Sequence, residues 1–456
     1  MYYLQRIRGI LIVPLAVIML ITGISGVTKN EQIRREEAVE TATQDDFVPV
    51  FRFAITSDTH LRTANDPRNA ERLAEMFRTA YAYADNHPTY QCLDAVLLAG
   101  DIVDSGHDDE YAELNRVVSE SIREGTEFIT VMGNHEYHYG GHEGYMRNMN
   151  TELDVHKVIK GFHIIGLSTD PTDTWHTPLQ LNWLSRQLRE AAKDDPEKPI
   201  FTMQHGHIWN TVYVSRSWYT QMSLPLHMVY SQYPQVVNFS GHSHGPVNNP
   251  INIWQNNYTT LGCGTLNYFE MERDIGDDTV PAGADRAAQY TIVEVDANNR
   301  VRLQPFNILT GDFFKTPSNT DDPDKQLVWQ IDKPSDPKSF AYTKARKKTD
   351  SAPWFEEGAE ITAQAGANDV SLTFEQAKAD VCVYGYRIQI AKAAKPKKIV
   401  AEKEIYAEYY FEPMPETQSV TIDGLEPGTD YVARVIPLNV WLAKGEPLTT
   451  GFTTAP

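Results

Sequence analysis

Residues 51–60 read FRFAITSDTH, a run of apolar side chains that ends in an aspartate, a threonine and a histidine. The same arrangement recurs four more times: an apolar run typical of a buried strand is followed at once by polar residues that can bind a metal. The five runs are FRFAITS, DAVLLAG, FITVMG, PIFTMQ and VVNFSG. Side chains at the ends of several strands converge on one edge of a sheet, where an open α/β fold places its site. The sequence therefore predicts an α/β (α+β) fold with one polar site at a sheet edge.

The polar motifs after these strands consist of carboxylate, amide and imidazole groups. In chain order they are Asp58-Thr59-His60, Gly100-Asp101-Ile102-Val103-Asp104, Gly133-Asn134-His135-Glu136, His205-Gly206-His207 and Gly241-His242-Ser243-His244. Two divalent metals about 3.5–4 Å apart can generate hydroxide and hold phosphoryl oxygens during phosphate ester hydrolysis. Such a pair needs one bridging carboxylate and about three further protein ligands for each metal. The motifs supply that number, so we predict a binuclear metal site.

The ordered set resembles the calcineurin-like metallophosphoesterase superfamily over roughly residues 50–310. The shared pattern is D-x-H, G-D-x-x-D, G-N-H-[D/E], a lone His and G-H-x-H, and every part of it is present. The resemblance implies a bridging role for Asp101 and divides the other ligands between two metals. One metal would be held by Asp58, His60 and His244, and the other by Asn134, His205 and His242.

The resemblance also implies roles for two residues that bind no metal. His135 would lie over the substrate and protonate the leaving oxygen or bind phosphate, and Asp104 would orient His135. The implied reaction is hydrolysis of a phosphomonoester or phosphodiester, with metal-bound hydroxide attacking phosphorus. Imidazole and carboxylate ligands suit Mn, Fe, Zn or Co, so metal identity stays open. Purple acid phosphatases of this superfamily carry an iron-binding Tyr where Asp104 stands, so we expect no ferric-tyrosinate colour.

Several of these residues have alternative interpretations. His205 is favoured as a ligand because it comes first after its strand, but His207 shares its face in an extended chain. Glu136 is expected to support its loop. His107, His138 and His142 are expected to be solvated loop residues.

The alternation of apolar runs and helical patterns predicts a four-layer αββα sandwich over residues 47–314. Helices are expected at 67–86, at 109–124 with Gly125 as the terminating residue, and at 178–192. QYTIVEVD and RVRLQPFNI are separated by Ala297-Asn298-Asn299, which predicts a hairpin. Residues 207–234 are rich in aromatic side chains and Met, which favours either a pocket wall or an amphipathic helix and loop.

Residues 315–352 are rich in Lys, Asp, Pro and Ser and are predicted to be a linker, although Trp329 and Phe340 could dock on a neighbouring domain. Residues 353–456 alternate in the manner of strands and predict an all-β, immunoglobulin-like sandwich. The turn before Tyr431 fits a tyrosine corner. This region resembles a fibronectin type III domain, with Phe374 where such domains often carry a buried Trp.

The amino-terminal residues are predicted to be a targeting segment that directs the chain to the secretory route. Arg6 and Arg8 precede a short apolar run and a set of small residues, so 1–26 reads as a signal peptide or, alternatively, a membrane anchor. Residues 27–46 read as a polar spacer. We therefore expect a secreted or cell-envelope protein. The three cysteines are far apart and form no CxxC pair, which argues against a thiolate zinc site.

Acidic residues outnumber basic ones by 61 to 41, giving a formal charge of −20. This disfavours a stable nucleic-acid partner, which needs a basic surface. The expected partner is a phosphorylated small molecule or a nucleotide, with cell-wall or surface contact through the carboxy-terminal domain. Two alternatives stay open: a nucleotidase or nuclease of the same superfamily, and a non-enzymatic adhesion or scaffold protein of the cell envelope.

Overall fold

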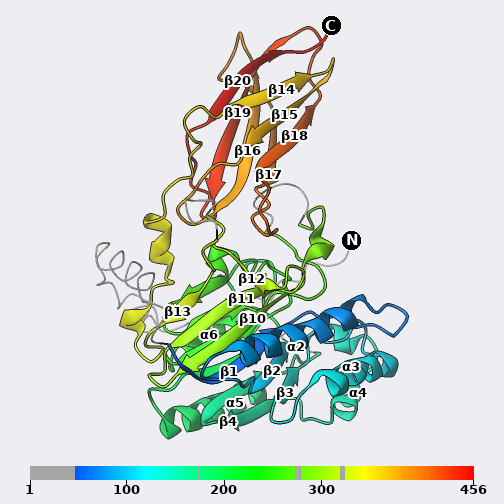
Figure 1. Cartoon of the computed structure of the whole chain (residues 1–456), viewed down its shortest axis with the longest axis vertical. Coiled ribbons are helices and arrows are strands. Elements are labelled where there is room, and N and C mark those ends of the chain that lie inside the picture. Colours follow the sequence, from blue (N-terminus) through cyan, green and yellow to red (C-terminus); the bar gives the residue numbers. More distant parts are fainter. Residues whose placement is uncertain (1–46, 172–174, 273–274, 276–278, 319–323) are drawn as a thin grey trace, which may run out of the picture.

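The structure, a computed structural model, describes residues 47–171, 175–272, 275, 279–318 and 324–456. They form an α/β unit followed by a β unit, which lie end to end along the long axis (Figure 1). The predicted signal peptide and polar spacer, 1–26 and 27–46, lie outside the described residues. Within the described part, no helix has the length and apolar character needed to cross a membrane.

The first sheet of the α/β unit has seven strands in the order β12-β11-β10-β1-β2-β3, with β13 paired to β11. Its strands are β1 (Pro49–Thr56), β2 (Ala95–Ala99), β3 (Glu127–Val131), β10 (Gln289–Asp296), β11 (Val301–Asn307), β12 (Asp312–Phe313) and β13 (Trp329–Ile331). β1, β2 and β3 run parallel, so their carboxyl ends share one edge. β10 and β11 form the predicted antiparallel hairpin.

The second sheet has six strands in the order β4-β5-β6-β7-β9-β8. These strands are β4 (Val155–Ile159), β5 (Phe162–Leu167), β6 (Ile200–Gln204), β7 (Val236–Ser240), β8 (Ile253–Gln255) and β9 (Thr259–Gly262). β5, β6, β7 and β9 are parallel, and β4 and β8 pair antiparallel at the two edges. The carboxyl ends of β6 and β7 therefore also share an edge.

The two sheets pack face to face over an apolar core. Phe51 and Phe53 of β1 meet Phe162 and Phe201 of the second sheet, with ring centroids 4.9 Å apart in both the Phe51–Phe162 and Phe53–Phe201 pairs. Helices cover the outer faces, which confirms the predicted αββα sandwich. α2 (Arg68–Asn86), α3 (Asp108–Ser121) and α4 (Gly141–Met149) pack on the first sheet, and α5 (Pro178–Asp194) and α6 (Ser223–Tyr230) on the second.

The predicted helices at 67–86 and 178–192 are present as α2 and α5, but the predicted helix at 109–124 ends early. α3 stops at Ser121, because Ile122 already has an extended backbone with φ −73° and ψ 136°. Gly125, with φ +88°, lies in the turn before β3 and does not terminate the helix. Short 3₁₀ helices occur at η3 (His135–Tyr137), η4 (Pro250–Asn252), η5 (Ala284–Arg286), η6 (Pro337–Ser339) and η7 (Lys344–Lys348).

Much of the segment predicted as a linker packs on the α/β unit. β13 extends the first sheet, and Trp329, Phe340 and Tyr342 belong to the core between the two sheets. Gln255 and Tyr342 exchange hydrogen bonds, since the backbone N of each donates to an oxygen of the other. Although this segment is mostly polar, a few apolar residues therefore anchor it to the α/β unit.

The β unit consists of two antiparallel sheets, in the orders β14-β15-β18 and β17-β16-β19-β20. Its strands are β14 (Ile361–Ala365), β15 (Asp369–Glu375), β16 (Val383–Lys392), β17 (Ile399–Tyr406), β18 (Thr417–Asp423), β19 (Asp430–Asn439) and β20 (Leu448–Thr453). Phe374 and Tyr386 lie in the core that both sheets share. The tyrosine corner is present, because the Glu426 backbone N donates to the Tyr431 hydroxyl over 2.9 Å.

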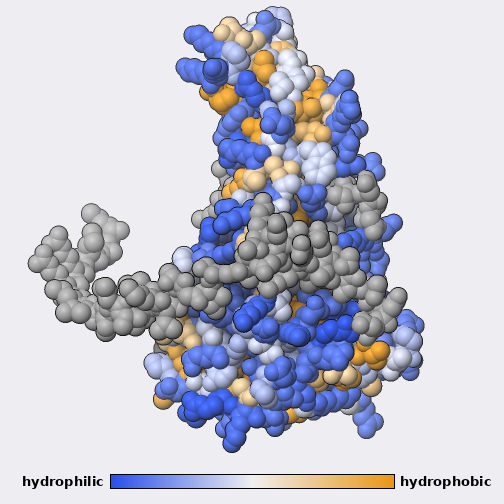
Figure 2. Space-filling view, turned by 90° about the vertical axis from the view of Figure 1, so that its left-hand side faces the viewer, coloured by the Kyte–Doolittle hydropathy of each residue, from blue (hydrophilic) through white to orange (hydrophobic). Residues whose placement is uncertain are grey.

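A cluster of buried aromatic residues joins the two units. Tyr213 and Met271 of the α/β unit pack with Tyr384 and Tyr409 of the β unit. The hydroxyl groups of Tyr213 and Tyr384 are 2.8 Å apart, and Asn249 Nδ2 donates to the Tyr409 hydroxyl over 2.7 Å. On the face in Figure 2, hydrophobic residues form only small separate patches among hydrophilic ones. The residues of the cluster that joins the units are themselves buried, so these apolar contacts are interior ones.

Candidate metal centre

The five predicted motifs lie directly after β1, β2, β3, β6 and β7, so both sheets contribute to one site. The chain turns sharply at these strand ends, with φ of 51° at Asp58, 49° at Asp101 and 70° at His242. Positive φ is unfavourable for residues other than glycine, and such residues cluster at functional sites. These turns direct the polar side chains toward one another.

Asp58, His60 and His244 form one group of potential metal ligands. Asp58 Oδ1 lies 3.2 Å from His244 Nε2 and 3.9 Å from His60 Nε2, and the two imidazole atoms are 3.1 Å apart. The second carboxylate oxygen of Asp58 accepts a hydrogen bond from the His242 backbone N. His244 Nδ1 donates to the Tyr268 carbonyl over 2.8 Å, which turns Nε2 toward the group.

Asp101, His205 and His242 form a second group. His205 Nε2 lies 3.0 Å from Asp101 Oδ2, while His205 Nδ1 donates to the Ala99 carbonyl over 2.9 Å. Asn134 stands in the loop after β3, next to His135, whose backbone N donates to Asp101 Oδ1. The predicted ligands after four different strands thus converge here.

Asp101 lies between the two groups. Its Oδ2 atom is 3.0 Å from His205 Nε2 of the second group and 3.9 Å from His60 Nε2 of the first. Asp101 Oδ2 is also 3.9 Å from His135 Nε2. His60, Asp101 and His135 therefore form a further possible ligand set. One carboxylate oxygen that faces both groups is the arrangement required of a bridging ligand.

The chemistry of these atoms fits bound cations. Within the described chain, Asp58 Oδ1, Asn134 Oδ1 and His205 Nε2 are buried without a hydrogen-bond partner, although buried polar atoms are nearly always paired. His205 Nε2 is close to Asp101 Oδ2, but their alignment is not that of a hydrogen bond. Asp58 and Asp101 are 0% and 1% exposed, and their ion-pair partners among these residues are histidines. Two buried carboxylates in such surroundings call for positive charge.

The pKa values show how the protein meets this need without a cation. Burial opposes ionisation of Asp58, yet the neighbouring His244 and His205 keep its pKa below the usual value. Burial also disfavours the charged form of His205, but Asp101 raises the pKa of His205 to about 10. His242 is different, because burial lowers its pKa to about 3. A cation at His205 Nε2 would therefore compete with a proton for that nitrogen.

The structure brings His205, and not His207, to the cluster. His207 is buried with Nδ1 2.7 Å from Ser240 Oγ and Nε2 2.6 Å from Ser243 Oγ. Both of its ring nitrogens are therefore engaged by hydroxyl groups. Burial lowers the pKa of His207 to about 3, so it remains a neutral structural group.

Asp104 contacts His135 as expected, but through its backbone carbonyl and not through its carboxylate. His135 Nδ1 donates to the backbone carbonyl of Asp104 over 2.6 Å. The Asp104 carboxylate instead lies 3.6 Å from His60 Nδ1 and 3.2 Å from Arg62 Nε. Asp104 therefore supports His135 through its backbone and a predicted ligand, His60, through its side chain.

Glu136 supports the loop, as expected. Its carboxylate is buried and accepts hydrogen bonds from the backbone N of Val103 and of Gly133. Burial and the charge of Asp101 raise the pKa of Glu136 to about 8. The neighbouring His138 and His142 are outside the groups of potential ligands found among the described residues.

Sequence reasoning missed the role of Trp175 and placed Trp218 only within a broad aromatic stretch. The Trp175 ring is centred 4.6 Å from the His242 ring, and the Trp218 ring 4.9 Å from it. Tyr268 lies 4.4 Å from His244 by the same measure. Trp175 follows β5, which carries no ligand motif, but its position after a parallel strand of the same sheet was an available signal.

The aromatic stretch at 207–234 divides between several environments. Tyr213 enters the contact with the β unit, Tyr230 is the buried last residue of α6, and Trp209 is 53% exposed. Trp218 reaches the metal cluster. The stretch consists of the helix α6 and a loop, which is closer to the expected helix and loop than to a continuous pocket wall.

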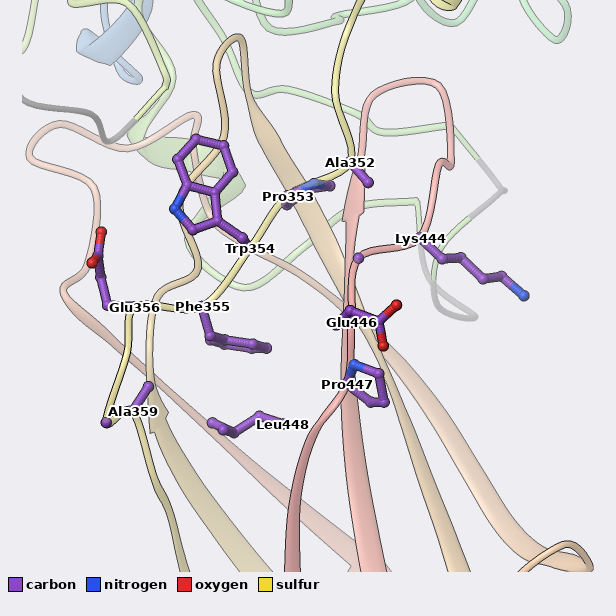
Figure 3. A pocket seen from close by; sticks show the side chains of 12 residues that line it. Ala352, Pro353, Trp354, Phe355, Glu356, Ala359, Lys444, Glu446, Pro447 and Leu448 are labelled. Atoms are coloured by element: carbon purple, nitrogen blue, oxygen red, sulfur yellow. The ribbon is translucent and has the colours of Figure 1, made fainter.

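A separate cavity lies in the β unit, far from the motifs in sequence. It has a volume of about 480 Å³ and is lined by residues 352–356, 358–359 and 444–448. Figure 3 shows Phe355 and Leu448 pointing into the same space, with Glu446 and Pro447 across from them. It contains none of the predicted ligands, so the metal cluster remains the candidate site.

Comparison with known proteins agrees with this site. Residues 51–246 match the family model described as calcineurin-like phosphoesterase. No curated protein matches the chain. Among solved structures, the purple acid phosphatase PPD1 from yellow lupin (Lupinus luteus) seeds shows 14% identity and a TM-score of 0.42, over 58% of this chain and 52% of that chain. The FN5 domain of Drosophila Lar shows 16% identity and a TM-score of 0.16, over 24% of this chain and 98% of that chain.

Proposed function

We propose that the calcineurin-like phosphoesterase domain at residues 51–246 hydrolyses phosphate esters with the help of two divalent cations. The observation that carries this proposal is a pair of ligand groups that share one buried carboxylate, that of Asp101. The ligands of the two cations would be Asp58, His60 and His244 on one side and Asn134, His205 and His242 on the other.

When bound, two such cations generate a nucleophile from water at neutral pH and neutralise the phosphoryl oxygens. The imidazole and carboxylate donors suit Mn, Fe, Zn or Co. The protein's part is to hold these donors in place before substrate arrives. Asp101 does so with both oxygens, because Oδ1 is fixed by the His135 backbone N and Oδ2 faces the two groups.

His135 is suited to act on the substrate. Its side chain is 30% exposed, whereas those of His205 and His244 are 0% and 7% exposed. Because Nδ1 donates to the Asp104 carbonyl, Nε2 is directed toward the cluster. Nε2 can therefore hold a proton for the leaving oxygen or contact a phosphoryl oxygen.

The test is metal analysis of the purified chain, followed by assays with nitrophenyl phosphate and bis(nitrophenyl) phosphate in each metal. We expect two metals per chain and hydrolysis of at least one ester. Asp101→Asn should lower both metal content and hydrolysis by more than the 10–100-fold typical of losing a supporting residue. Asp85→Asn, at an exposed helix position, is the control. If neither ester is hydrolysed with any metal, a scaffold role replaces this proposal.

We also propose a cellular location and a substrate class for this protein. A secreted or cell-envelope location rests on the amino-terminal sequence, and fractionation of cells that express the full chain tests it. The substrate would be a phosphorylated small molecule or a nucleotide. A nucleotidase is the second candidate function, and the tryptophans beside His242 favour it over a nuclease.

A further inference from the structure

Two tryptophans border the metal cluster with part of each ring accessible. Trp175 and Trp218 contact the His242 ring edge to face, with interplanar angles of 70° and 88°. Trp175 also lies nearly parallel to the His205 ring, at 18° and 6.2 Å. Both tryptophans are half-buried, so each keeps some surface that a ligand can reach.

A cavity of about 240 Å³ adjoins Trp218. It is lined by Ser217, Trp218, Met271 and Thr279. Trp218 takes part both in lining this cavity and in the contact with His242. Its volume is below the roughly 300–1,000 Å³ of sites for drug-sized ligands, and so suits a single ring system.

The chemistry of this border favours a flat, uncharged group. Indole faces and the Met271 thioether attract aromatic rings. At the first ligand group, Tyr268 lies beside His244 and donates from its hydroxyl to Glu270 Oε1 over 3.1 Å. The Glu270 carboxylate disfavours a second phosphate there. Only the phosphate at the metals would carry negative charge.

The β unit holds this border in place. Trp218 N donates to the Val214 carbonyl in a turn whose Tyr213 and Val214 are buried against the β unit. The hydrogen bond between Tyr213 and Tyr384 ties this turn to β16. A wall fixed before binding loses little freedom when a ligand arrives.

We propose that Trp175 and Trp218 form a substrate wall that stacks the planar ring of a phosphate ester's alcohol part, such as an aryl group or a nucleobase. This rests on the proposed function, because the wall is useful only if phosphate binds at the cluster. The β unit then acts as a support for substrate selection.

Binding to the full, metal-loaded chain tests the wall without turnover. Phenylphosphonate and methylphosphonate share the phosphoryl group but differ in the ring. We expect phenylphosphonate to bind more tightly by calorimetry, and Trp218→Ala to weaken it about 2- to 12-fold, the range for one aromatic pair. Methylphosphonate binding should not change. Trp218→Phe should retain most of the preference, and Trp209→Ala, at an exposed position in the same stretch, should retain all of it.

Three results would overturn the wall. If Trp218→Ala weakens both phosphonates equally, the tryptophan only supports His242. If wild type binds the two phosphonates equally while hydrolysing nitrophenyl phosphate, the proposed function is supported and the proposed wall is wrong. If neither phosphonate binds and no ester is hydrolysed, the proposed function itself fails and the wall with it.

Discussion

Backbone carbonyl groups orient three of the imidazoles at the metal cluster. His205 Nδ1 donates to Ala99, His244 Nδ1 to Tyr268 and His135 Nδ1 to Asp104. A carbonyl can only accept, so each Nδ1 carries the hydrogen and each Nε2 is free to face the cluster. This shared tautomer is set by chain geometry, and no side-chain partner is needed.

The contrast between His205 and His207 gives a prediction. His205→Ala should abolish binding of at least one metal, because it removes a ligand atom that faces Asp101. His207→Ala should keep both metals yet lower stability, because the buried Ser240 hydroxyl loses its partner at a cost of about 1–3 kcal/mol, while Ser243 Oγ keeps the Gly245 backbone N. Metal content and thermal unfolding of the two variants, measured side by side, check this. Metal loss in the His207 variant alone would reverse the assignment.

Asp104 gives a second prediction, because its carboxylate and its backbone carbonyl contact different histidines. Asp104→Asn should weaken metal binding about 10–100-fold, the usual effect of losing a group that supports a ligand, here His60. It should leave His135 in place, because that contact uses the backbone. The measurements are metal titration and the rate at saturating metal. A large loss of rate at full occupancy would show that the carboxylate acts through His135 after all.

These residues show what sequence can and cannot reveal about a site. The ligand types and their order are visible because they must be Asp, Asn or His at strand ends. His205 and His207 stay ambiguous in sequence, because residues two apart share a face in an extended chain. The contact of the Asp104 backbone carbonyl with His135 could not be predicted, because a residue of any type carries such a carbonyl.

At the scale of elements, the close approach of strand ends determines how the two sheets build one site. A Cβ on Gly241 would lie 2.5 Å from Ser57 Cβ and 2.8 Å from Asp58 Oδ2. Gly241 follows β7 of the second sheet, whereas Ser57 follows β1 of the first. The glycine is thus where the two sheets come together.

Gly241→Ala should therefore act on both stability and metal binding. Overpacking at such a contact costs about 1–3 kcal/mol, and the displaced Asp58 should bind its cation less tightly. Thermal unfolding and metal titration check the two effects. Gly144→Ala is the matched control: Gly144 lies in α4 with no atom within 4 Å of the added Cβ, so alanine should stabilise by about 0.5–1 kcal/mol. Equal effects at the two glycines would contradict the argument.

Elements were predictable where local pattern and packing agree. The buried strands that lead to the motifs are continuous apolar runs, as parallel strands should be. α4 was missed because Gly141 and Gly144 disfavour a helix, yet Tyr145 stabilises it by packing, with its hydroxyl 2.7 Å from Thr130 Oγ1. The end of α3 was misplaced because Gly125 marks a turn that follows the helix.

At the scale of the whole molecule, the contact between the two units is larger and more specific than a flexible tether provides. Besides the tyrosine cluster, Asn439 Nδ2 donates to Asp350 Oδ2, and the Arg286 guanidinium lies 3.9 Å from the Phe411 ring. Sequence could suggest the two units but not this contact, because its residues are spread over more than two hundred positions. Packing between distant segments has no local pattern.

The last prediction concerns the pH dependence of this contact. Glu412 of the β unit accepts a hydrogen bond from the Lys315 backbone N, and burial raises the pKa of Glu412 to about 7 from its usual 4.5. The folded chain therefore holds this proton more tightly than the unfolded chain does. The resulting stability is fully present below pH 4.5 and is lost as pH rises through 7.

Glu412→Gln keeps the shape and an acceptor for Lys315 but removes the titration. Wild type and variant should unfold at similar temperatures near pH 4, and the variant should be the more stable at pH 8. Solvent screening at this partly exposed group limits the gain to about 1 kcal/mol, or roughly 2–4 °C in a domain of 150–250 residues. Thermal unfolding across pH 4 to 8 measures the difference. A constant offset between the two proteins over that range would mean that the pKa of Glu412 is the same in the folded and unfolded chains, and that the contact between the units does not respond to pH through this residue.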